Sequence, residues 1–510
     1  MNPSMHIMKN LGGSICSSQA LIFASSQPYQ ELIRQGTDFL WNNILLFALL
    51  GIGIYLSVTL RFPQVRFLFP TMKKMVQAII RREPAKPGSM TAFQSLATAV
   101  ASQVGTGNII GVATAIASGG PGAGFWMLVS AFFGMATIFA ESVLAQLHVK
   151  TVHGEKVGGP AYYLENGLHS RFLAVSFAIL CILALGVVGI MVQGSSVIES
   201  VNAAFGVPKA WVAIGLAAIV GFILTGGMNR IAKFSETVVP LMAFIYIFAS
   251  LVMLLMNLPL LWPTIQAIFL GAFRPQALFG GALGISMQEA VRFGIARGLF
   301  SNEAGMGSTP HSHAVADVDH PADQGMVAMI GVFICTFCIC LATAMVNLMA
   351  GSYQTNIPAS EMAKEASLMT QHAFQNSFGT FGGGFLSIAL SCFALTTIIG
   401  WYFFAENNIK YLFANSKFSF IRKNDKVAIV FARIAALGII LLSTVLEGDF
   451  IWTLADLFMG LMAIPNILGL ALLHRQSKAV LLDYEAQLAQ GAKPTWHGLD
   501  KAMALLPEKK

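Results

Sequence analysis

Long apolar stretches recur along the chain, and short segments rich in charged residues separate them. We count eleven stretches that predict membrane-spanning helices, each of which needs about 20 apolar residues. The stretches cover residues 39–60, 91–117, 122–148, 172–200, 211–226, 237–256, 287–316, 326–350, 383–412, 427–445 and 450–474. The pattern therefore predicts an all-α polytopic membrane protein.

The second stretch is interrupted at its centre by Gly105, Thr106, Gly107 and Asn108. Each glycine costs a helix about 1 kcal/mol relative to alanine. Within hydrocarbon, an opened backbone is tolerated only where it lines a buried cavity. We therefore predict a discontinuous helix whose freed N–H and C=O groups face a small charged solute and a cation. The alternative is a packing motif, in which small residues let another helix approach closely.

The seventh stretch is also interrupted, by the polar and glycine-rich segment SNEAGMGS at 301–308. If the first stretch is set aside, ten helices remain, and the two broken ones open each group of five. Because five is odd, the second group enters the membrane from the opposite side. This order predicts a 5+5 inverted repeat with one extra N-terminal helix and a solute site at the repeat interface.

Composition and charge agree with a membrane protein. Hydrophobic residues make up 55% of the 510 residues and charged residues 11%, whereas soluble proteins carry about 25% charged residues. The net charge of +7 does not indicate a nucleic-acid partner, because the cations concentrate in particular loops. Their distribution predicts an external N-terminus and a cytoplasmic C-terminus.

The predicted organisation follows from these spans and loops. It consists of an N-terminal tail (1–38), an extra transmembrane helix (39–60), a cytoplasmic amphipathic connector (61–90), a first five-helix repeat (91–256), an outer connection (257–286), a second five-helix repeat (287–474) and a charged cytoplasmic tail (475–510). Residues 351–377 are predicted to form a polar outer loop.

Three motifs identify a possible family. They are FQSLATAVASQVGTGNIIGVATAIASGGPGAGFWM (93–127), ARGLFSNEAGMGSTP (296–310) and TTIIGW (396–401). In them, and over roughly residues 46–473, the chain resembles the alanine/glycine:cation symporters, also called sodium:alanine symporters. Gly124 and Leu128 depart from the residues usual in that family. The resemblance implies a leucine-transporter-like fold, a bacterial inner-membrane location, and import of alanine or glycine with sodium as the co-transported ion.

An amino-acid zwitterion needs N–H donors for its carboxylate and oxygen acceptors for its ammonium group. We assign Thr106, Gly107 and Asn108 to the carboxylate, although the side-chain oxygen of Asn108 could instead serve a cation. Gly305 and Gly307 would let the backbone approach the substrate, so that carbonyls of the broken helix receive the ammonium group. Close helix packing is the alternative explanation for these two glycines.

Sodium prefers hard oxygen ligands. Thr396 and Thr397 are adjacent hydroxyls deep in the ninth stretch, although a helical threonine most often bonds its own i−4 carbonyl. The resemblance implies a sodium site here, with the carbonyls of Ala101, Val104 and Phe393 as further ligands. Thr397 is also expected to border the substrate.

Five other residues complete the predicted site. Trp401, one turn beyond the threonine pair, would restrict the site to small side chains, unless it is a core or interfacial tryptophan. Gln193 is a lone amide in an apolar span, and it is either a substrate contact or a bridge between helices. Glu141 is expected to cap N–H groups freed by the seventh-stretch break. Glu303 is expected to form an ion pair with Arg297.

Other functional classes fit the pattern less well. Cys335, Cys338 and Cys340 resemble a metal motif, but their Phe and Ile neighbours indicate apolar packing. All ten histidines fall in loops, tails or span ends, which argues against an intramembrane enzyme. The asymmetric pair of breaks argues against a channel. The closest rival is another small-solute transporter of the same fold, or a proton-coupled one using Glu303 or Glu141.

Overall fold

The computed structural model describes residues 29–81, 85–152, 154–273, 287–350, 362–414, 424–445 and 448–506. Within these ranges the chain is mostly helical, with one hairpin of two short antiparallel strands. Seven of the described helices are long and apolar enough to cross a bilayer, or eight if one bent pair of helices counts as a single span. The protein is therefore a multi-pass membrane protein.

The described elements follow one another along the chain with short connections. The first part contains η1 (Leu40–Leu45), α2 (Leu46–Thr59), α3 (Pro63–Arg66), α4 (Leu68–Arg81), α5 (Ala92–Gln103), η2 (Thr106–Asn108), α6 (Ile110–Gly119), α7 (Gly122–Leu147), β1 (Lys150–Val152), β2 (Glu155–Val157), α8 (Pro160–Leu168), α9 (Arg171–Cys181), η3 (Ile182–Gly189), α10 (Ile190–Phe205), α11 (Lys209–Leu224), α12 (Gly227–Met256), η4 (Leu258–Leu260) and α13 (Leu261–Phe273). The second part contains α15 (Met287–Asn302), α16 (Pro310–Ala314), α17 (Pro321–Val332), η5 (Phe333–Cys340), α18 (Leu341–Met349), α19 (Met362–Phe378), α20 (Thr380–Ala414), α22 (Asp425–Leu442), α23 (Gly448–Ala489) and α24 (Leu499–Met503).

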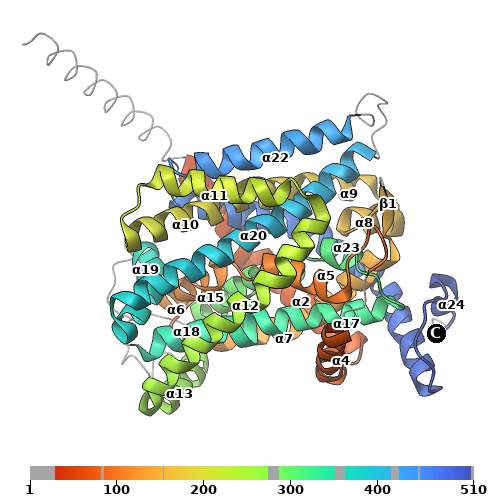
Figure 1. The fold of residues 1–510 in the computed structure, drawn as a ribbon. Helices are drawn as coiled ribbons and strands as arrows, with labels where there is room; N and C mark the ends of the chain where they lie inside the picture. The colour runs from red at the N-terminus through yellow and green to blue at the C-terminus, as the bar shows by residue number, and fades with distance from the viewer. Residues whose placement is uncertain are drawn as a thin grey trace, which may run out of the picture.

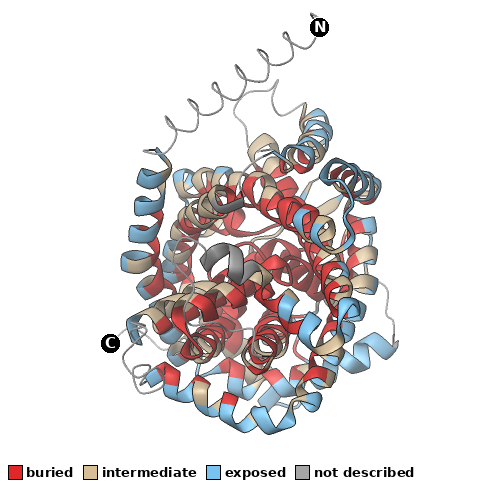
Figure 2. Cartoon of the chain, turned by 90° about the vertical axis from the view of Figure 1, so that its left-hand side faces the viewer, coloured by how far each residue is buried: buried red, intermediate tan, exposed pale blue. Residues whose placement is uncertain are grey.

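Each of the eleven predicted stretches falls on described helices. The count of eleven membrane crossings remains a prediction, because length and composition support seven or eight. Figure 2 shows the buried residues gathered inside the bundle and the exposed ones on its outer helices. Many of those exposed residues are large and apolar, including Phe222, Phe244 and Phe431, as a surface that faces lipid requires.

The predicted break in the second span is confirmed. Helices α5 and α6, with η2 between them, are bent by 64° relative to each other. Val104, which follows α5, has non-helical backbone angles (φ −102°, ψ 81°). A capping box formed by Thr91 and Gln94 starts α5, so this half-helix begins with its freed N–H groups satisfied locally.

The seventh span is broken as well, between α15 and α16. Glu303, Gly305 and Gly307 all have positive φ angles in this segment (57°, 85° and 82°). Glycine adopts this region freely, whereas a side chain such as that of Glu303 is uncommon there. Pro310 then occupies the first turn of α16, where its missing N–H costs nothing. Helix α15 packs against α6, and Figure 1 shows these two helices next to each other inside the bundle, with α5 to their right.

Helix α7 forms the centre of the packing and contacts both α15 and α17 extensively. Small residues bring α15 close to it. A Cβ added to Gly294 would lie 2.4 Å from the backbone oxygen of Ala123, and one added to Gly298 would lie 2.5 Å from Ser130 Oγ. Close approach of this kind holds membrane helices together by van der Waals contact.

The predicted outer loop at 351–377 is wrong over its second half. Residues 351–361 lie outside the described residues, but Met362–Phe378 form helix α19. Met369, Thr370, Ala373 and Phe374 are buried, and they form two pairs four positions apart, which places them on one face of a helix. That face packs against α6 and α20. The polar residues between them lower the mean hydropathy of the segment, so the apolar face was not recognised in the sequence.

The first and last long helices extend beyond the predicted spans. The first helix begins at Tyr29, within the predicted tail, and α23 continues to Ala489, beyond the predicted end at 474. The charged extension of α23 contacts the connector and the residue that caps α17. Glu485 forms an ion pair with Arg66 at 2.8 Å, and Asp483 lies within hydrogen-bond distance of His320 at 3.1 Å. Tertiary partners therefore extend a helix whose sequence is too polar for a span.

Replacing Gly294 by alanine should destabilise the protein by about 1–3 kcal/mol, because the new methyl group has no room against the α7 backbone. The apparent unfolding temperature of the detergent-solubilised protein measures this change. Gly215→Ala is the matched control, since nothing lies within 4 Å of a Cβ added at that exposed helical glycine. Equal unfolding temperatures for the two variants would contradict the packing described for α7 and α15.

Candidate functional site

Four oxygen atoms from two helices converge at Thr397. Its Oγ1 lies 2.9 Å from the carbonyl oxygen of Ala101, 3.2 Å from that of Val104 and 3.0 Å from that of Phe393. Thr397 is fully buried. A hydroxyl carries a single proton and can donate a full hydrogen bond to only one of these carbonyls. The remaining lone pairs face one another, an arrangement that suits a hard cation.

Thr396 is adjacent in sequence but points to different partners. Its Oγ1 lies 2.9 Å from the carbonyl oxygen of Phe393, which it shares with Thr397, and 3.6 Å from the sulfur of Met242 on α12. Its described hydrogen bonds therefore connect it to the oxygen cluster through the Phe393 carbonyl rather than through α5.

Groups freed by the α5–α6 break are met by two side-chain amides. The N–H of Thr106 donates to Gln193 Oε1 of α10 at 3.1 Å, and the N–H of Gly105 donates to Asn108 Oδ1 at 3.0 Å. The oxygen of Asn108 is thus engaged within the break. The hydroxyl of Thr106 is buried and has no hydrogen-bond partner among the described residues. A buried hydroxyl without a partner costs about 1–3 kcal/mol, so this atom is available to a ligand.

The amide nitrogen of Asn108 reaches two thiols of η5. Its Nδ2 lies 3.0 Å from Cys335 Sγ and 3.3 Å from Cys340 Sγ. The hydroxyl of Ser301, at the end of α15, lies 3.1 Å from the same Cys340 sulfur. These contacts join the two breaks through η5, and sequence reasoning did not predict them.

Gly105 belongs to the site, although it was not among the predicted ligands. A Cβ at this position would lie 2.6 Å from Thr397 Oγ1 and 3.1 Å from Gln193 Oε1. The backbone of Gly105 therefore separates the oxygen cluster from the amide that caps the break. A Cβ at Gly107 would instead meet the ring of Phe300 at 3.2 Å, so this ring covers the break on its other side.

The second break is held by Glu141 and Asn466. Glu141 Oε1 accepts hydrogen bonds from the N–H of Gly307 at 3.1 Å and from Asn466 Nδ2 at 2.5 Å. Asn466 Nδ2 also donates to the carbonyl oxygen of Gly305 at 2.8 Å. These bonds direct Gly305 and Gly307 toward α7 and α23, and not toward the break of the second span. Asn466, a lone amide after Pro465 in an apolar span, was the overlooked signal.

The predicted ion pair between Glu303 and Arg297 is wrong. The Nη1 and Nη2 atoms of Arg297 each donate a hydrogen bond of 3.0 Å to the carboxylate of Asp456 on α23. Glu303 Oε1 instead accepts a hydrogen bond from Trp401 Nε1 at 2.6 Å. Arg297 lies within α15, whereas Glu303 follows the end of that helix, where the positive φ angle turns the chain toward α5 and α20. Arg297 and Glu303 are therefore close in sequence but face opposite directions.

Aromatic rings separate the break from the Arg297–Asp456 pair. The ring of Phe300 lies 5.7 Å from that of Trp452. The guanidinium carbon of Arg297 lies 5.6 Å from the Phe300 centroid and 6.0 Å from the Trp452 centroid. Such distances allow cation–π attraction. Phe300, which covers Gly107, is thereby packed against both Trp452 and Arg297.

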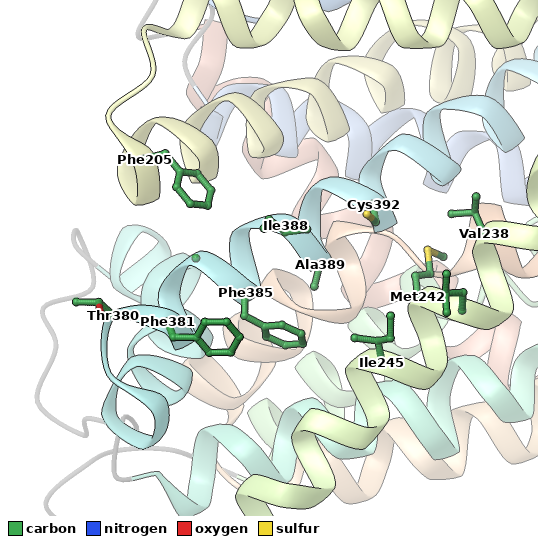
Figure 3. A pocket seen from close by; sticks show the side chains of 12 residues that line it. Phe205, Val238, Met242, Ile245, Thr380, Phe381, Phe385, Ile388, Ala389 and Cys392 are labelled. Carbon is green, nitrogen blue, oxygen red and sulfur yellow. The ribbon is translucent and has the colours of Figure 1, made fainter.

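A large apolar pocket of about 530 Å³ opens elsewhere, between α10, α12 and α20. Figure 3 shows Phe205, Phe385, Met242 and Ile245 around it. An amino-acid zwitterion would find almost no hydrogen-bond partners there, and burying an unpaired charge costs many kcal/mol. The pocket is therefore not the solute site, although its wall residue Met242 contacts Thr396.

Comparisons with known proteins agree with the sequence resemblance. A profile of the sodium:alanine symporter family matches residues 26–498. The sodium/alanine symporter AgcS of Methanococcus maripaludis is 38% identical over 451 residues, which cover 87% of this chain and 95% of that protein. The amino-acid carrier protein AlsT of Bacillus subtilis is 36% identical over 469 residues, 92% of this chain and 95% of that protein. A third relative, described as "Probable sodium/glutamine symporter GlnT" of the same bacterium, is 38% identical over 475 residues, 92% of this chain and 94% of its own length.

Among solved structures, a variant of the manganese transporter of Eremococcus coleocola is similar over 81% of this chain and 83% of its own. The sequence identity is 14% and the TM-score is 0.46.

Replacing Asn466 by alanine should lower the free energy of unfolding by roughly 1–3 kcal/mol, because Glu141 and the Gly305 carbonyl would lose a buried partner. Thermal unfolding of the purified protein measures the loss. Asn43→Ala is the control, since the exposed Asn43 bonds only a carbonyl of its own helix in the described contacts. If both variants unfold at the same temperature as the wild type, the second break does not depend on Asn466.

Proposed function

The chain belongs to the sodium:alanine symporter family, and from this premise we propose that it imports a small neutral amino acid, alanine or glycine, together with sodium. The family and its relatives make it a sodium-coupled amino-acid transporter and not an enzyme. The named substrates of the relatives differ, since one is called an alanine symporter and another a glutamine symporter. The choice of a small solute therefore rests on the site of this chain.

The observation that carries the proposal is the oxygen cluster at Thr397. Sodium is proposed to bind the carbonyls of Ala101, Val104 and Phe393 and the hydroxyls of Thr396 and Thr397. Two of these carbonyls belong to the last turn of α5 and to the residue after it, where the helix has ended and C=O groups lack intrahelical partners. An ion at this position would bind α5 to α20 and hold the break in one conformation.

The amino acid is proposed to bind at the α5–α6 break, beside the ion. Its carboxylate would meet the N–H groups of Thr106, Gly107 and Asn108, displacing Gln193 Oε1 from Thr106 and the Gly105 carbonyl from Asn108. The Thr106 hydroxyl, which has no partner among the described residues, would support it. The positive end of the α6 dipole favours an anion there. All of these groups are buried. The zwitterion would therefore find partners for both of its charges in only a few positions.

Two aromatic residues bear on the side chain of the solute. Gly305 and Gly307, which were predicted to approach the substrate, are not part of the proposed site, because they face α7 and α23 and the Gly305 carbonyl is engaged by Asn466. Trp401, which packs against Gly189, would limit the side chain to a methyl group or a hydrogen. The ring of Phe300 over Gly107 supports the same limit.

Alternating access between two inverted five-helix repeats in a leucine-transporter-like fold is part of this proposal. The Arg297–Asp456 pair lies on the side predicted to be external. On the side predicted to be cytoplasmic, Asp317 pairs with Lys86 at 3.1 Å and with Lys156 at 3.8 Å. Transport would open these closures in turn. Each sodium ion moving through 100 mV supplies about 2.3 kcal/mol beyond its concentration gradient.

Purified protein in liposomes should accumulate labelled alanine when sodium is outside, and much less when sodium is replaced by potassium at equal osmolarity. Sodium entry down its gradient is the driving force. Labelled glutamine under the same gradient tests the proposed size limit. Equal alanine uptake with and without the sodium gradient would reject coupling, and preferential uptake of glutamine would reject the small-solute assignment.

Replacing Thr397 by valine should raise the sodium concentration for half-maximal alanine uptake by roughly tenfold or more, which corresponds to about 1.4 kcal/mol. The substitution keeps the shape of the side chain and removes one oxygen ligand. Thr114→Val is the matched control, because the described hydrogen bond of Thr114 goes to the Ile110 carbonyl of its own helix. An unchanged sodium dependence in Thr397→Val would exclude this hydroxyl as a ligand.

A further inference from the structure

Glu303 is a carboxylate in the protein interior with no basic partner among the described residues. Its side chain is buried, and its described hydrogen-bond partners are Trp401, Ser102 and Ser308. The nearest arginine in the sequence, Arg297, is engaged by Asp456. An ionised carboxylate buried without a counter-charge costs several kcal/mol. Glu303 therefore needs a cation or a proton to remain in this position.

The atoms around Glu303 Oε2 are mostly oxygens. Ser308 Oγ donates a hydrogen bond to it, and Ser102 Oγ lies 3.4 Å away. The Ser102 hydroxyl also lies 2.7 Å from the carbonyl oxygen of Ala99. The shorter contact takes the single proton of Ser102. A lone pair of Ser102 is then left facing the carboxylate, and the repulsion between them is relieved if a positive charge lies between the two oxygens.

We propose that Glu303 Oε2, Ser102 Oγ, Ser308 Oγ and the Ala99 carbonyl form a second cation site, and that this site takes sodium. These are hard oxygen ligands, and one of them carries a full negative charge, which suits a small hard cation. The inference rests on the proposed function, because it adds an ion to the same transport cycle. It differs from the site at Thr397, whose proposed ligands are all neutral.

The two sites share the same pair of helices. Ser102 follows Ala101 on α5, and Trp401, which bonds Glu303, lies one turn beyond Thr397 on α20. Glu303 itself begins the break of the seventh span. Sodium at this second site would therefore connect both broken helices to α20, so that each break responds to the ions. Two sodium ions would then accompany each zwitterion, and two positive charges would cross the membrane.

Equilibrium binding of labelled sodium to the purified protein tests the proposal without requiring transport. The wild type should bind two sodium ions per chain and Glu303→Gln one, whereas Thr397→Val should bind one ion as the wild type does and the other roughly tenfold more weakly, as expected from its lost ligand. Glu199→Gln, at an exposed carboxylate of α10, is the matched control and should bind two. One sodium ion per wild-type chain, or an unchanged number in Glu303→Gln, would overturn the second site.

Two further measurements keep the test decisive if Glu303→Gln does not fold. Ser308→Ala retains the carboxylate and should weaken one of the two sodium-binding steps several-fold while leaving the other unchanged. In liposomes, the charge moved per labelled alanine should be two for the wild type. If one sodium ion and one proton enter per alanine, a proton neutralises Glu303 and the sodium assignment is wrong. If the protein binds two sodium ions but carries no alanine, the second site stands and the proposed substrate fails.

Discussion

A polypeptide inside a bilayer must satisfy its own N–H and C=O groups, and this constraint governs the whole structure. The chain breaks the rule of continuous helices at two places, one after α5 and the other after α15. Every group freed there needs a partner from another part of the protein. The long helices α7, α10, α20 and α23 supply these partners, and their packing around the breaks keeps lipid away from the opened backbone.

The two breaks use this freedom differently. The break after α15 is closed by protein groups, since Glu141 and Asn466 take up the N–H of Gly307 and the carbonyl of Gly305. The break after α5 is only partly closed. Gln193 caps one N–H there, while the Thr106 hydroxyl has no partner in the part of the chain that the structure describes, and three carbonyl oxygens lie close to Thr397. The first break therefore has polar groups that could bind solute and ion. The second break is held in place by its own hydrogen bonds and packs beside the first.

Much of the fold could be predicted because the physics is local. Runs of apolar residues locate spans, and glycines beside polar residues in such a run locate the two breaks. The threonine pair and the α5 carbonyls were predicted as one cluster through family resemblance, and the structure brings Thr397 within 3.2 Å of both Ala101 and Val104. Helix α19 was missed because its buried face is interspersed with polar residues, which lower mean hydropathy without destroying helical periodicity.

The sequence by itself determined the membrane class, the positions of both interruptions and the residue types available for ligands. Only the tertiary structure decided which charges meet. Arg297 pairs with Asp456, 159 positions away, rather than with the nearby Glu303, and Asn466 reaches a break more than 150 residues before it. The reason is geometric. A break reverses the direction in which neighbouring side chains point, so partners are chosen by the crossing of distant helices, and one sequence carries no direct record of those crossings.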